Sequence, residues 1–150
     1  MEFADLVRRR SSVRSYDPDR PVERAVLERI LEVGRLAPSA GNRQPWRFLV
    51  ISTPDMLAKV RSAYSKPWFN DAPHVLAVVG KVAEAWTRQP DGYNSIETDL
   101  TIAMDHMILA ATNEGVGTCW IAAFHLDLLR PALGLADDEK VFAMTPLGYP

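Results

Sequence analysis

One long apolar segment, Ser95 to Gly115, constrains the fold more than any other part of the chain. Its apolar residues cover almost the whole circumference of the helix that their spacing predicts. A helix without a broad polar face is buried on most sides, and a chain of 150 residues has room for one core. The segment therefore predicts either the axis of that core or a subunit interface. Its apolar members are Ile96, Leu100, Ile102, Ala103, Met104, Met107, Ile108, Leu109, Ala110 and Ala111.

The other helical patterns are shorter and carry end signals. Gly115 and Gly117 are expected to end the long helix, because glycine is favoured where a helix stops. A short helix is expected after residue 124, with Asp127 as its N-cap and Pro131 tolerated only in its first turn. Helical spacing predicts three further helices, over residues 2–10, 22–36 and 54–64.

Short continuous apolar runs alternate with these helices. Such runs are typical of strands that are buried on both faces of a sheet. No repeat or linker-like composition divides the chain, so residues 1–150 are expected to form one domain. The expected class is a three-layer α+β or α/β domain, with one sheet and helices on its faces. The predicted strands are 48–51, 75–79, 119–124 and 141–145.

Composition excludes several classes of protein. A net charge of −2 argues against a nucleic-acid binder that works by bulk electrostatics. The single cysteine, Cys119, rules out an internal disulfide and suits a reducing compartment. No apolar run approaches the ~18 residues of a membrane span, and the start of the chain lacks the pattern of a signal peptide. The expected location is the cytoplasm, with neither nucleic acid nor membrane as a partner.

The stretch from Leu36 to Ile51 joins a helix end to a strand through residues that restrict or permit unusual backbone geometry. We expect a rigid loop with a free amide side chain at Asn42 and free backbone donors from Ser39 to Asn42. Such donors suit a flat heterocycle. A capped turn between two elements is the alternative.

A cluster of four arginines, Arg8, Arg9, Arg10 and Arg14, precedes this loop. Guanidinium groups make bidentate contacts with phosphate, and the neighbouring Ser11 and Ser12 could add hydroxyl donors. Arg10 and Arg14 share one face if the first helix continues that far. The alternative is a solvated basic turn.

Metal and nucleophile chemistry find little support. His74, His106 and His125 are scattered without ligand spacing, and each is expected to be a hydrogen-bonded structural histidine. Nothing supplies the cationic setting that a catalytic Cys119 would need. Asp105 and His106 are adjacent on the long helix and do not face each other, so satisfaction by the core or a partner subunit is favoured over an acid–base pair.

Four segments in register resemble the nitroreductase family of flavoproteins: Arg10–Arg14, Ala37–Trp46, Leu109–Ile121 and Pro146–Pro150. The resemblance covers essentially the whole chain. It implies an FMN-binding α+β fold with a central mixed or antiparallel sheet flanked by helices. It also implies a homodimer with FMN at the interface.

The resemblance implies roles for individual residues. The arginine cluster would bind the FMN phosphate and the pyrimidine side of the ring system. The Pro38 to Gln44 loop would reach over the flavin held by the partner subunit. The strand segment from Trp120 to Ala123 would lie beside the reactive edge, and alanine at Ala122 and Ala123, where many relatives have glycine, tightens that space. The implied cofactor-binding residues are Arg10, Ser11, Ser12, Arg14, Pro38, Ser39, Ala40, Asn42, Gln44, Trp120, Ile121, Ala122 and Ala123.

The activity implied by the resemblance is NADH- or NADPH-dependent reduction of nitroaromatics, quinones or related flat acceptors. Hydride would pass through flavin N5 by ping-pong exchange, without a catalytic residue. A non-catalytic flavin-binding or dimeric interaction protein of the same fold is the alternative. Candidates for the substrate mouth, which could equally cap the core, are Trp68, Phe69, Trp86, Arg88 and Tyr93.

Relatives generally continue past the Gly-Tyr-Pro segment into a C-terminal arm that carries a basic residue for the phosphate. The present sequence stops at Pro150, as a short form or with the arm missing. The resemblance therefore implies that the phosphate rests mainly on the N-terminal arginines, with weaker FMN affinity than in full-length relatives.

Overall fold

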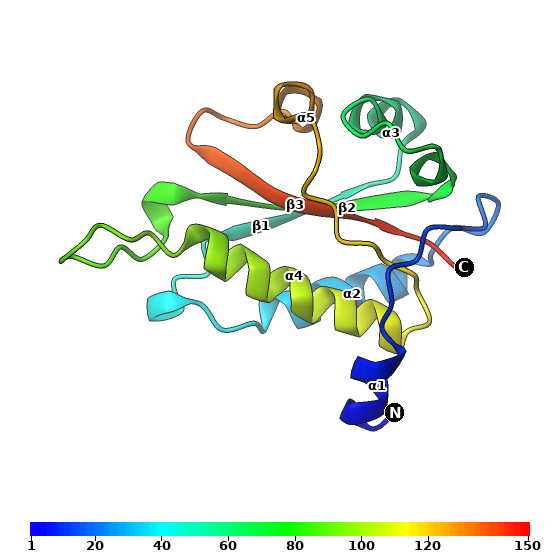
Figure 1. Cartoon of the computed structure of the whole chain (residues 1–150), viewed down its shortest axis with the longest axis horizontal. Helices are drawn as coiled ribbons and strands as arrows, with labels where there is room; N and C mark the ends of the chain where they lie inside the picture. The colour runs from blue at the N-terminus through cyan, green and yellow to red at the C-terminus, as the bar shows by residue number, and fades with distance from the viewer.

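A computed structural model describes all residues from 1 to 150. The chain forms three layers, with one antiparallel sheet between two layers of helices (Figure 1). The helices are α1 (Phe3–Arg9), α2 (Arg24–Arg35), α3 (Pro54–Arg61), α4 (Ile96–Asn113) and α5 (Leu126–Leu133). The strands are β1 (Trp46–Ile51), β2 (His74–Lys81) and β3 (Glu139–Leu147), and the short 3-10 helices are η1 (Ala40–Asn42), η2 (Pro67–Asp71) and η3 (Val82–Glu84).

The strands lie in the order β1-β2-β3, and both pairs are antiparallel. β2 is central, and its residues from His74 to Gly80 are all buried. Successive side chains of a strand point to opposite faces, so β2 supplies two cores at once. Leu76 and Val78 face one layer of helices, whereas Ala77 and Val79 face the other. The predicted α+β class with an antiparallel sheet is confirmed.

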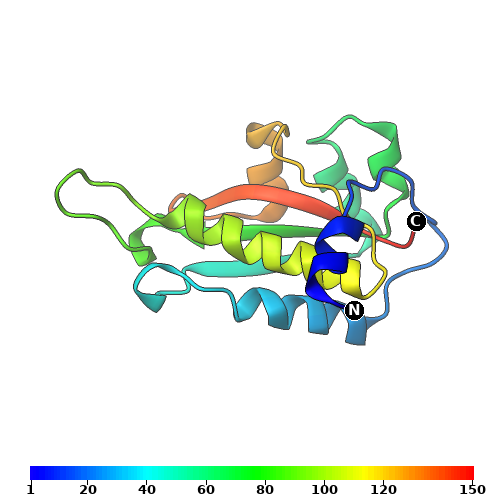
Figure 2. The same ribbon diagram turned by 60° about the horizontal axis from the view of Figure 1, so that its bottom comes forward.

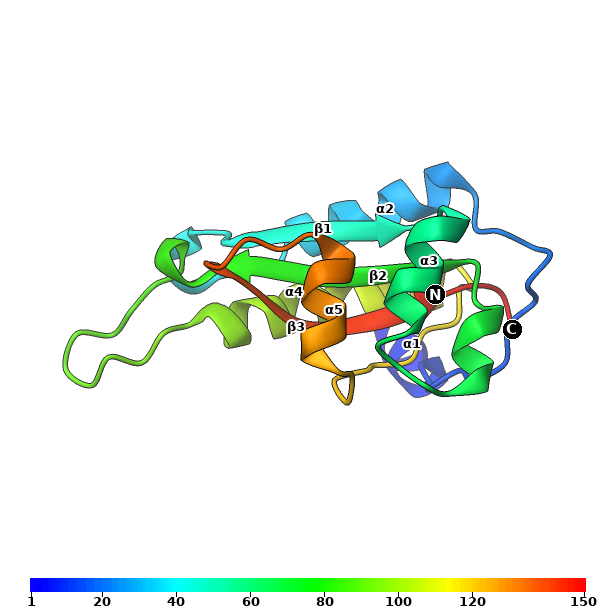
Figure 3. The ribbon, with the colours of Figure 1, turned by 90° about the horizontal axis from the view of Figure 1, so that it is seen from above.

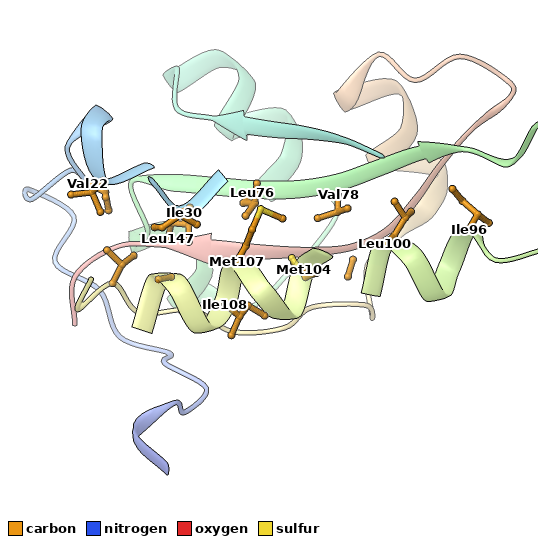
Figure 4. Close-up of a cluster of buried hydrophobic side chains, with 14 of the residues drawn as sticks. Val22, Ile30, Leu76, Val78, Ile96, Leu100, Met104, Met107, Ile108 and Leu147 are labelled. Carbon is orange, nitrogen blue, oxygen red and sulfur yellow. The ribbon is translucent and has the colours of Figure 1, made fainter. Parts of the chain in front are cut away.

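The two cores occupy opposite faces of the sheet. Below the sheet, α2 and α4 pack on β2, where Ile30, Leu100 and Met104 are fully buried (Figure 4). Above it, α3 and α5 lie across the strands, seen from above in Figure 3. Val60 of α3 and Leu129 of α5 are completely buried there. Helices on both faces explain why the strand runs are continuously apolar.

Helix α4 is the axis of the lower core. Its buried residues follow the helical period, including Leu100, Met104 and Met107. Its other side, with Leu109 and Asn113, lines an open hollow of about 730 Å³ between α1, α2 and α4. In Figure 2, α1 lies across the C-terminal half of α4.

The strand predicted over residues 119–124 does not form. The segment runs beside β3 but makes only isolated bridges to it, at Gly117 with Gly148 and at Ile121 with Met144. Between these bridges the backbone is bonded elsewhere. The Cys119 amide donates to Oγ1 of Thr145 (3.0 Å), and the Thr118 carbonyl accepts from the N-terminal segment. The ladder of backbone hydrogen bonds between this segment and β3 is therefore interrupted.

Two helix-end predictions were wrong in position. α5 begins after His125 rather than Asp127, so Pro131 lies in its second turn. The helix tolerates the missing amide because Leu129 and Leu133, four residues apart, are buried against the α3 layer. At α4, Gly115 has the left-handed φ of 76° expected beyond a helix end, but Gly117 does not cap the helix.

His74 connects three elements where β2 begins, and it is 7% exposed. Its Nε2 accepts from the Val22 amide (3.0 Å), which places the ring proton on Nδ1, 2.7 Å from Oγ of Ser52. Burial lowers the pKa of His74 below its ordinary value of 6.5. The neutral ring is therefore the form that the fold stabilises.

We predict that the fold loses stability as the pH falls below about 6.5, because the unfolded chain then binds a proton that folded His74 resists. The contribution is complete above the unfolded pKa and declines by at most about 1.4 kcal/mol per pH unit below it. Urea unfolding of the wild type and His74→Leu between pH 5 and 8 measures it. The variant should be less stable at pH 8 but less pH-dependent, whereas the exposed control His125→Gln should follow the wild type. Parallel profiles for all three proteins would contradict the assignment.

Candidate functional site

The loop between α2 and β1 has unusual backbone geometry. Gly41, Asn42 and Gln44 have φ angles of 60°, 52° and 50°. This left-handed region is routine for glycine, accessible to asparagine and costly for glutamine. The loop is therefore not a simple capped turn, and such strain clusters at functional sites.

Hydrogen bonds within the loop hold part of this geometry. Oγ of Ser39 accepts from the Gln44 amide (2.9 Å), and the Ser39 carbonyl accepts from the Asn42 amide (2.9 Å). Nε2 of Gln44 donates to Oδ1 of Asn42 (3.0 Å). The Ala40 amide donates to Oδ1 of Asp99 in α4 (2.9 Å).

The expectation of free donors throughout the loop was thus only partly correct. The amides of Ala40 and Asn42 are occupied, and so is the side-chain oxygen of Asn42. The amides of Ser39 and Gly41 and the Asn42 amide nitrogen Nδ2 have no partner within the chain. These three groups are the ones that can bind a ligand.

The N-terminal segment is extended beyond Arg9, where α1 ends, so Arg10 and Arg14 do not share a helix face. Ser12 pairs in parallel with Thr118, and the Val13 amide donates to the Thr118 carbonyl (2.8 Å). The approach is close: a Cβ on Gly117 would lie 2.9 Å from Cγ1 of Val13. Glycine at position 117 therefore permits this pairing.

The arginines differ in their partners. Arg8 pairs with Asp5 (3.1 Å), whereas Arg10 and Arg14 have no ion pair or side-chain hydrogen bond. Beside this segment lies a small cleft of about 160 Å³. The guanidinium group that borders this cleft is that of Arg9, whereas Arg10 and Arg14 do not line it. A guanidinium group beside serine, threonine and glycine fits a phosphate group. The cleft is lined by Arg9, Ser11, Val13, Thr112, Gly115, Val116, Gly117, Thr118 and Pro150.

Sequence reasoning missed two residues of this cleft. Arg9 was placed in the basic cluster without a role, and Thr112 was not considered. Thr112 lies in the last turn of α4, one residue before the helix ends at Asn113. Nothing in the local pattern distinguishes it from any other partly exposed helix residue.

The Trp120 to Ala123 segment continues from Thr118, which places it beside the arginine segment. Ala122 and Ala123 are exposed, and Trp120 packs edge-to-face on Phe142 with ring centroids 6.2 Å apart. Ile121 is buried, and its amide and carbonyl are both bonded to Met144 (2.9 and 3.0 Å). Ile121 therefore holds the segment on β3 and offers no free hydrogen-bonding group.

These elements form two separate groups within one chain. Asp99, which holds the loop, is in the first turns of α4, and Thr112, beside the arginines, is in its last turn. Thirteen residues of helix separate them by about 20 Å. Figure 1 shows the η1 loop and α1 at opposite ends of α4. The arginine and Trp120 segments lie together, and the loop lies apart.

The substrate-mouth candidates also separate. Trp86 and Tyr93 line a cavity of about 300 Å³ together with Pro38 and Ala40 of the loop. Arg88 ion-pairs with Asp91 (2.6 Å) and lies 4.9 Å from the Tyr93 ring centroid. Trp68 and Phe69 belong to the core on the other face of the sheet, which is the alternative role that the sequence left open for them.

The histidines, Asp105 and Cys119 do not form a reactive group. Nδ1 of His106 bonds with the Ile102 carbonyl (3.0 Å), and Asp105 is exposed. His125 is exposed and makes no side-chain hydrogen bond, unlike the expectation. Cys119 is buried. No His, Cys, Asp and Glu side chains cluster as metal ligands, and no helix is long and apolar enough to cross a membrane.

One antiparallel sheet between two layers of helices makes this chain a three-layer α+β domain. A nitroreductase family protein from Clostridium difficile 630 superimposes with a TM-score of 0.93 and 36% identity, over 99% of this chain and 84% of that one. A sequence model of the nitroreductase family matches residues 7–65 and 55–149. The chain therefore belongs to the nitroreductase family.

Two further similarities concern proteins with more specific names. A putative NADH dehydrogenase/NAD(P)H nitroreductase from Archaeoglobus fulgidus is 32% identical, over 99% of this chain and 86% of that protein. An FMN-dependent nitroreductase from Clostridium difficile R20291 has a TM-score of 0.83 at 23% identity, over 98% of this chain and 87% of that one. At that identity the second similarity concerns the fold.

We predict that Gly117→Ala destabilises the fold by about 1–3 kcal/mol, because the new methyl group overlaps Val13. Val13→Ala removes the Cγ atoms that it meets, so the double variant should recover part of the loss. Urea unfolding of the four proteins in this cycle measures the coupling. Strictly additive effects would contradict a direct contact between positions 13 and 117.

Proposed function

We propose that this chain is an FMN-dependent oxidoreductase that uses NADH or NADPH to reduce flat acceptors such as nitroaromatics or quinones. Family membership supports oxidoreductase activity. The observation that carries the FMN assignment is that Arg10 and Arg14, on an extended segment anchored to Thr118, have no ion pair within the chain. When bound, FMN would accept electrons from the nicotinamide and release them to the acceptor in a separate half-reaction, so a ping-pong order follows.

In this proposal the arginine segment holds the phosphate. Arg10 and Arg14 supply charge, and Ser11 and Ser12 supply hydroxyl donors from an extended backbone anchored on Thr118. The same positive charge favours the anionic reduced form of a nearby flavin. Trp120, Ala122 and Ala123 continue from this anchor and would border the ring, with Ile121 fixing their backbone.

The loop would serve a second cofactor, held by the partner of a homodimer. Its free donors at Ser39, Gly41 and Asn42 lie about 20 Å along α4 from the arginine segment of the same chain. The open hollow beside α4 is lined by Phe3, Leu6 and Leu109, which is the surface that a second subunit would bury. Dimerisation would then complete each site.

The acceptor would enter beside the loop, against the aromatic rings of Trp86 and Tyr93. Aromatic side chains stack on flat rings and tolerate different substituents. This arrangement supports a class of flat acceptors rather than one compound.

A non-catalytic flavin-binding protein of this fold is the second candidate. The two differ in one measurement on the purified yellow protein, which is the absorbance change on anaerobic addition of NADH or NADPH. Bleaching near 450 nm supports the oxidoreductase. Flavin that neither nicotinamide reduces favours the second candidate, and a protein that FMN cannot reconstitute contradicts both.

We predict that Arg10→Ala and Arg14→Ala each raise the FMN dissociation constant by about 10- to 150-fold, the value of one charge-assisted hydrogen bond. Arg8→Ala is the matched control, because Arg8 lies on α1 and pairs with Asp5. Fluorescence titration of apoprotein with FMN gives each constant. Equal constants for all three variants would place the phosphate elsewhere.

We predict that a mixed dimer restores a site that neither parent has. One chain carries Arg10→Ala with Arg14→Ala, and the other carries Asn42→Ala with Gln44→Ala. If each site joins the arginines of one chain to the loop of the other, the heterodimer has one intact site. Two affinity tags isolate it, and one tightly bound FMN per heterodimer is expected. No tight binding would show that both groups act within a single chain.

A further inference from the structure

Asp99 is a buried carboxylate without a cationic partner. It is 1% exposed, lies in the first turn of α4 and lines the cavity between the loop and the hairpin of residues 86–94. We call this hairpin, which carries Trp86 and Tyr93, the aromatic hairpin. Oδ1 accepts from the Ala40 amide (2.9 Å), and Oδ2 accepts from Oγ of Ser95 (2.7 Å). Both donors are neutral, so two hydrogen bonds, and no opposite charge, stabilise the buried carboxylate.

Ser95 connects Asp99 to the aromatic hairpin. Ser95 is 2% exposed, and its amide donates to the Trp86 carbonyl (2.9 Å). Between them Thr87 and Asn94 form an antiparallel bridge, and the hairpin projects from the end of the sheet (Figure 3). A continuous chain of hydrogen bonds thus runs from the hairpin through Ser95 and Asp99 to Ala40.

The loop at the other end needs an external support. Its left-handed residues Gly41, Asn42 and Gln44 cannot be held by regular secondary structure. Within the segment from Pro38 to Gln44, every other hydrogen bond joins two members of the loop. Asp99 is the one side chain outside the loop that bonds to it.

We propose that Asp99 is a positioning residue that sets the spacing between the flavin-facing loop and the aromatic hairpin. This inference rests on the proposed function. Through Oδ1 it fixes the loop that presents Gly41 and Asn42 to the flavin. Through Oδ2 and Ser95 it fixes the hairpin that presents Trp86 and Tyr93 to the acceptor. One buried group therefore links cofactor binding to acceptor binding.

A carboxylate suits this position for two physical reasons. Each of its two oxygens accepts from a different donor, Oδ1 from the Ala40 amide and Oδ2 from Oγ of Ser95, whereas a hydroxyl group has a single oxygen. The first turns of a helix also favour negative charge, because the free amides there carry partial positive charge. Truncation would leave a partly buried amide at Ala40 and a buried hydroxyl at Ser95 without their partner.

Three variants separate the two ends of the link. Asp99→Ala removes both bonds, and we expect the FMN dissociation constant to rise about 10- to 100-fold, with a higher KM for the acceptor. Asp99→Asn keeps an oxygen for Ala40 and an amide for Ser95, so it should stay within about threefold of the wild type. Ser95→Ala should raise the acceptor KM about three- to tenfold and leave the FMN constant almost unchanged.

The matched control is Glu97, an exposed carboxylate in the same helical turns that pairs with Lys140. Glu97→Ala and Glu97→Gln should reproduce the wild-type FMN constant and KM. If Asp99→Asn is as impaired as Asp99→Ala, or if Asp99→Ala resembles the Glu97 variants, the positioning role is overturned.

A measurement that needs no flavin keeps this test apart from the proposed function. Hydrogen exchange of the Ala40 amide in apoprotein should be slow in the wild type and Asp99→Asn, and at least tenfold faster in Asp99→Ala, with the amides of β2 unchanged. Unprotected Ala40 in the wild type would overturn the positioning role. Protected Ala40 in a wild type that binds no FMN would instead contradict the proposed function alone.

Discussion

The burial of α4 against β2 determines where every other functional element lies. Leu100, Met104 and Met107 pack with Leu76 and Val78 in one apolar cluster, so α4 cannot slide or rotate without exposing large apolar area. The loop is attached near one end of this helix through Asp99. The N-terminal segment lies near the other end, beside Gly117 and Thr118. The rigid helix therefore fixes the distance between the two groups.

Energetically the two groups are built in different ways. The loop stores strain at Asn42 and Gln44, each of which costs of order 1 kcal/mol, and recovers it through hydrogen bonds that point inward. The arginine segment carries little strain, but it leaves the charges of Arg10 and Arg14 uncompensated in the unbound state. A ligand that supplies negative charge at one group and a flat edge with acceptors at the other would relieve both conditions.

The sequence predicted the layers well because burial dominates them. β2 is recognisable from apolar residues alone because it is covered on both faces, and α4 because its buried residues follow the helical period. The same rule failed at residues 119–124, where an apolar run bonds to β3 only through the Ile121 backbone, while the Cys119 amide donates to the Thr145 side chain. For Trp68 and Phe69 the sequence left two roles open, and their aromatic rings pack in the upper core. Asp99 could not be identified from the sequence, because its role depends on a loop 59 residues away.

The arginine segment and the loop lie far apart along α4, and this separation has a thermodynamic consequence if they form one site across a dimer, as proposed. A ligand that touches the arginines of one chain and the loop of another acts as a bridge between subunits, so binding and association become linked equilibria. Cofactor loading would then strengthen the assembly, and dilution would weaken retention of the cofactor. In such a molecule the measured affinity for the cofactor depends on protein concentration. A dilute cell extract would therefore retain a smaller fraction of bound cofactor than a concentrated crystal.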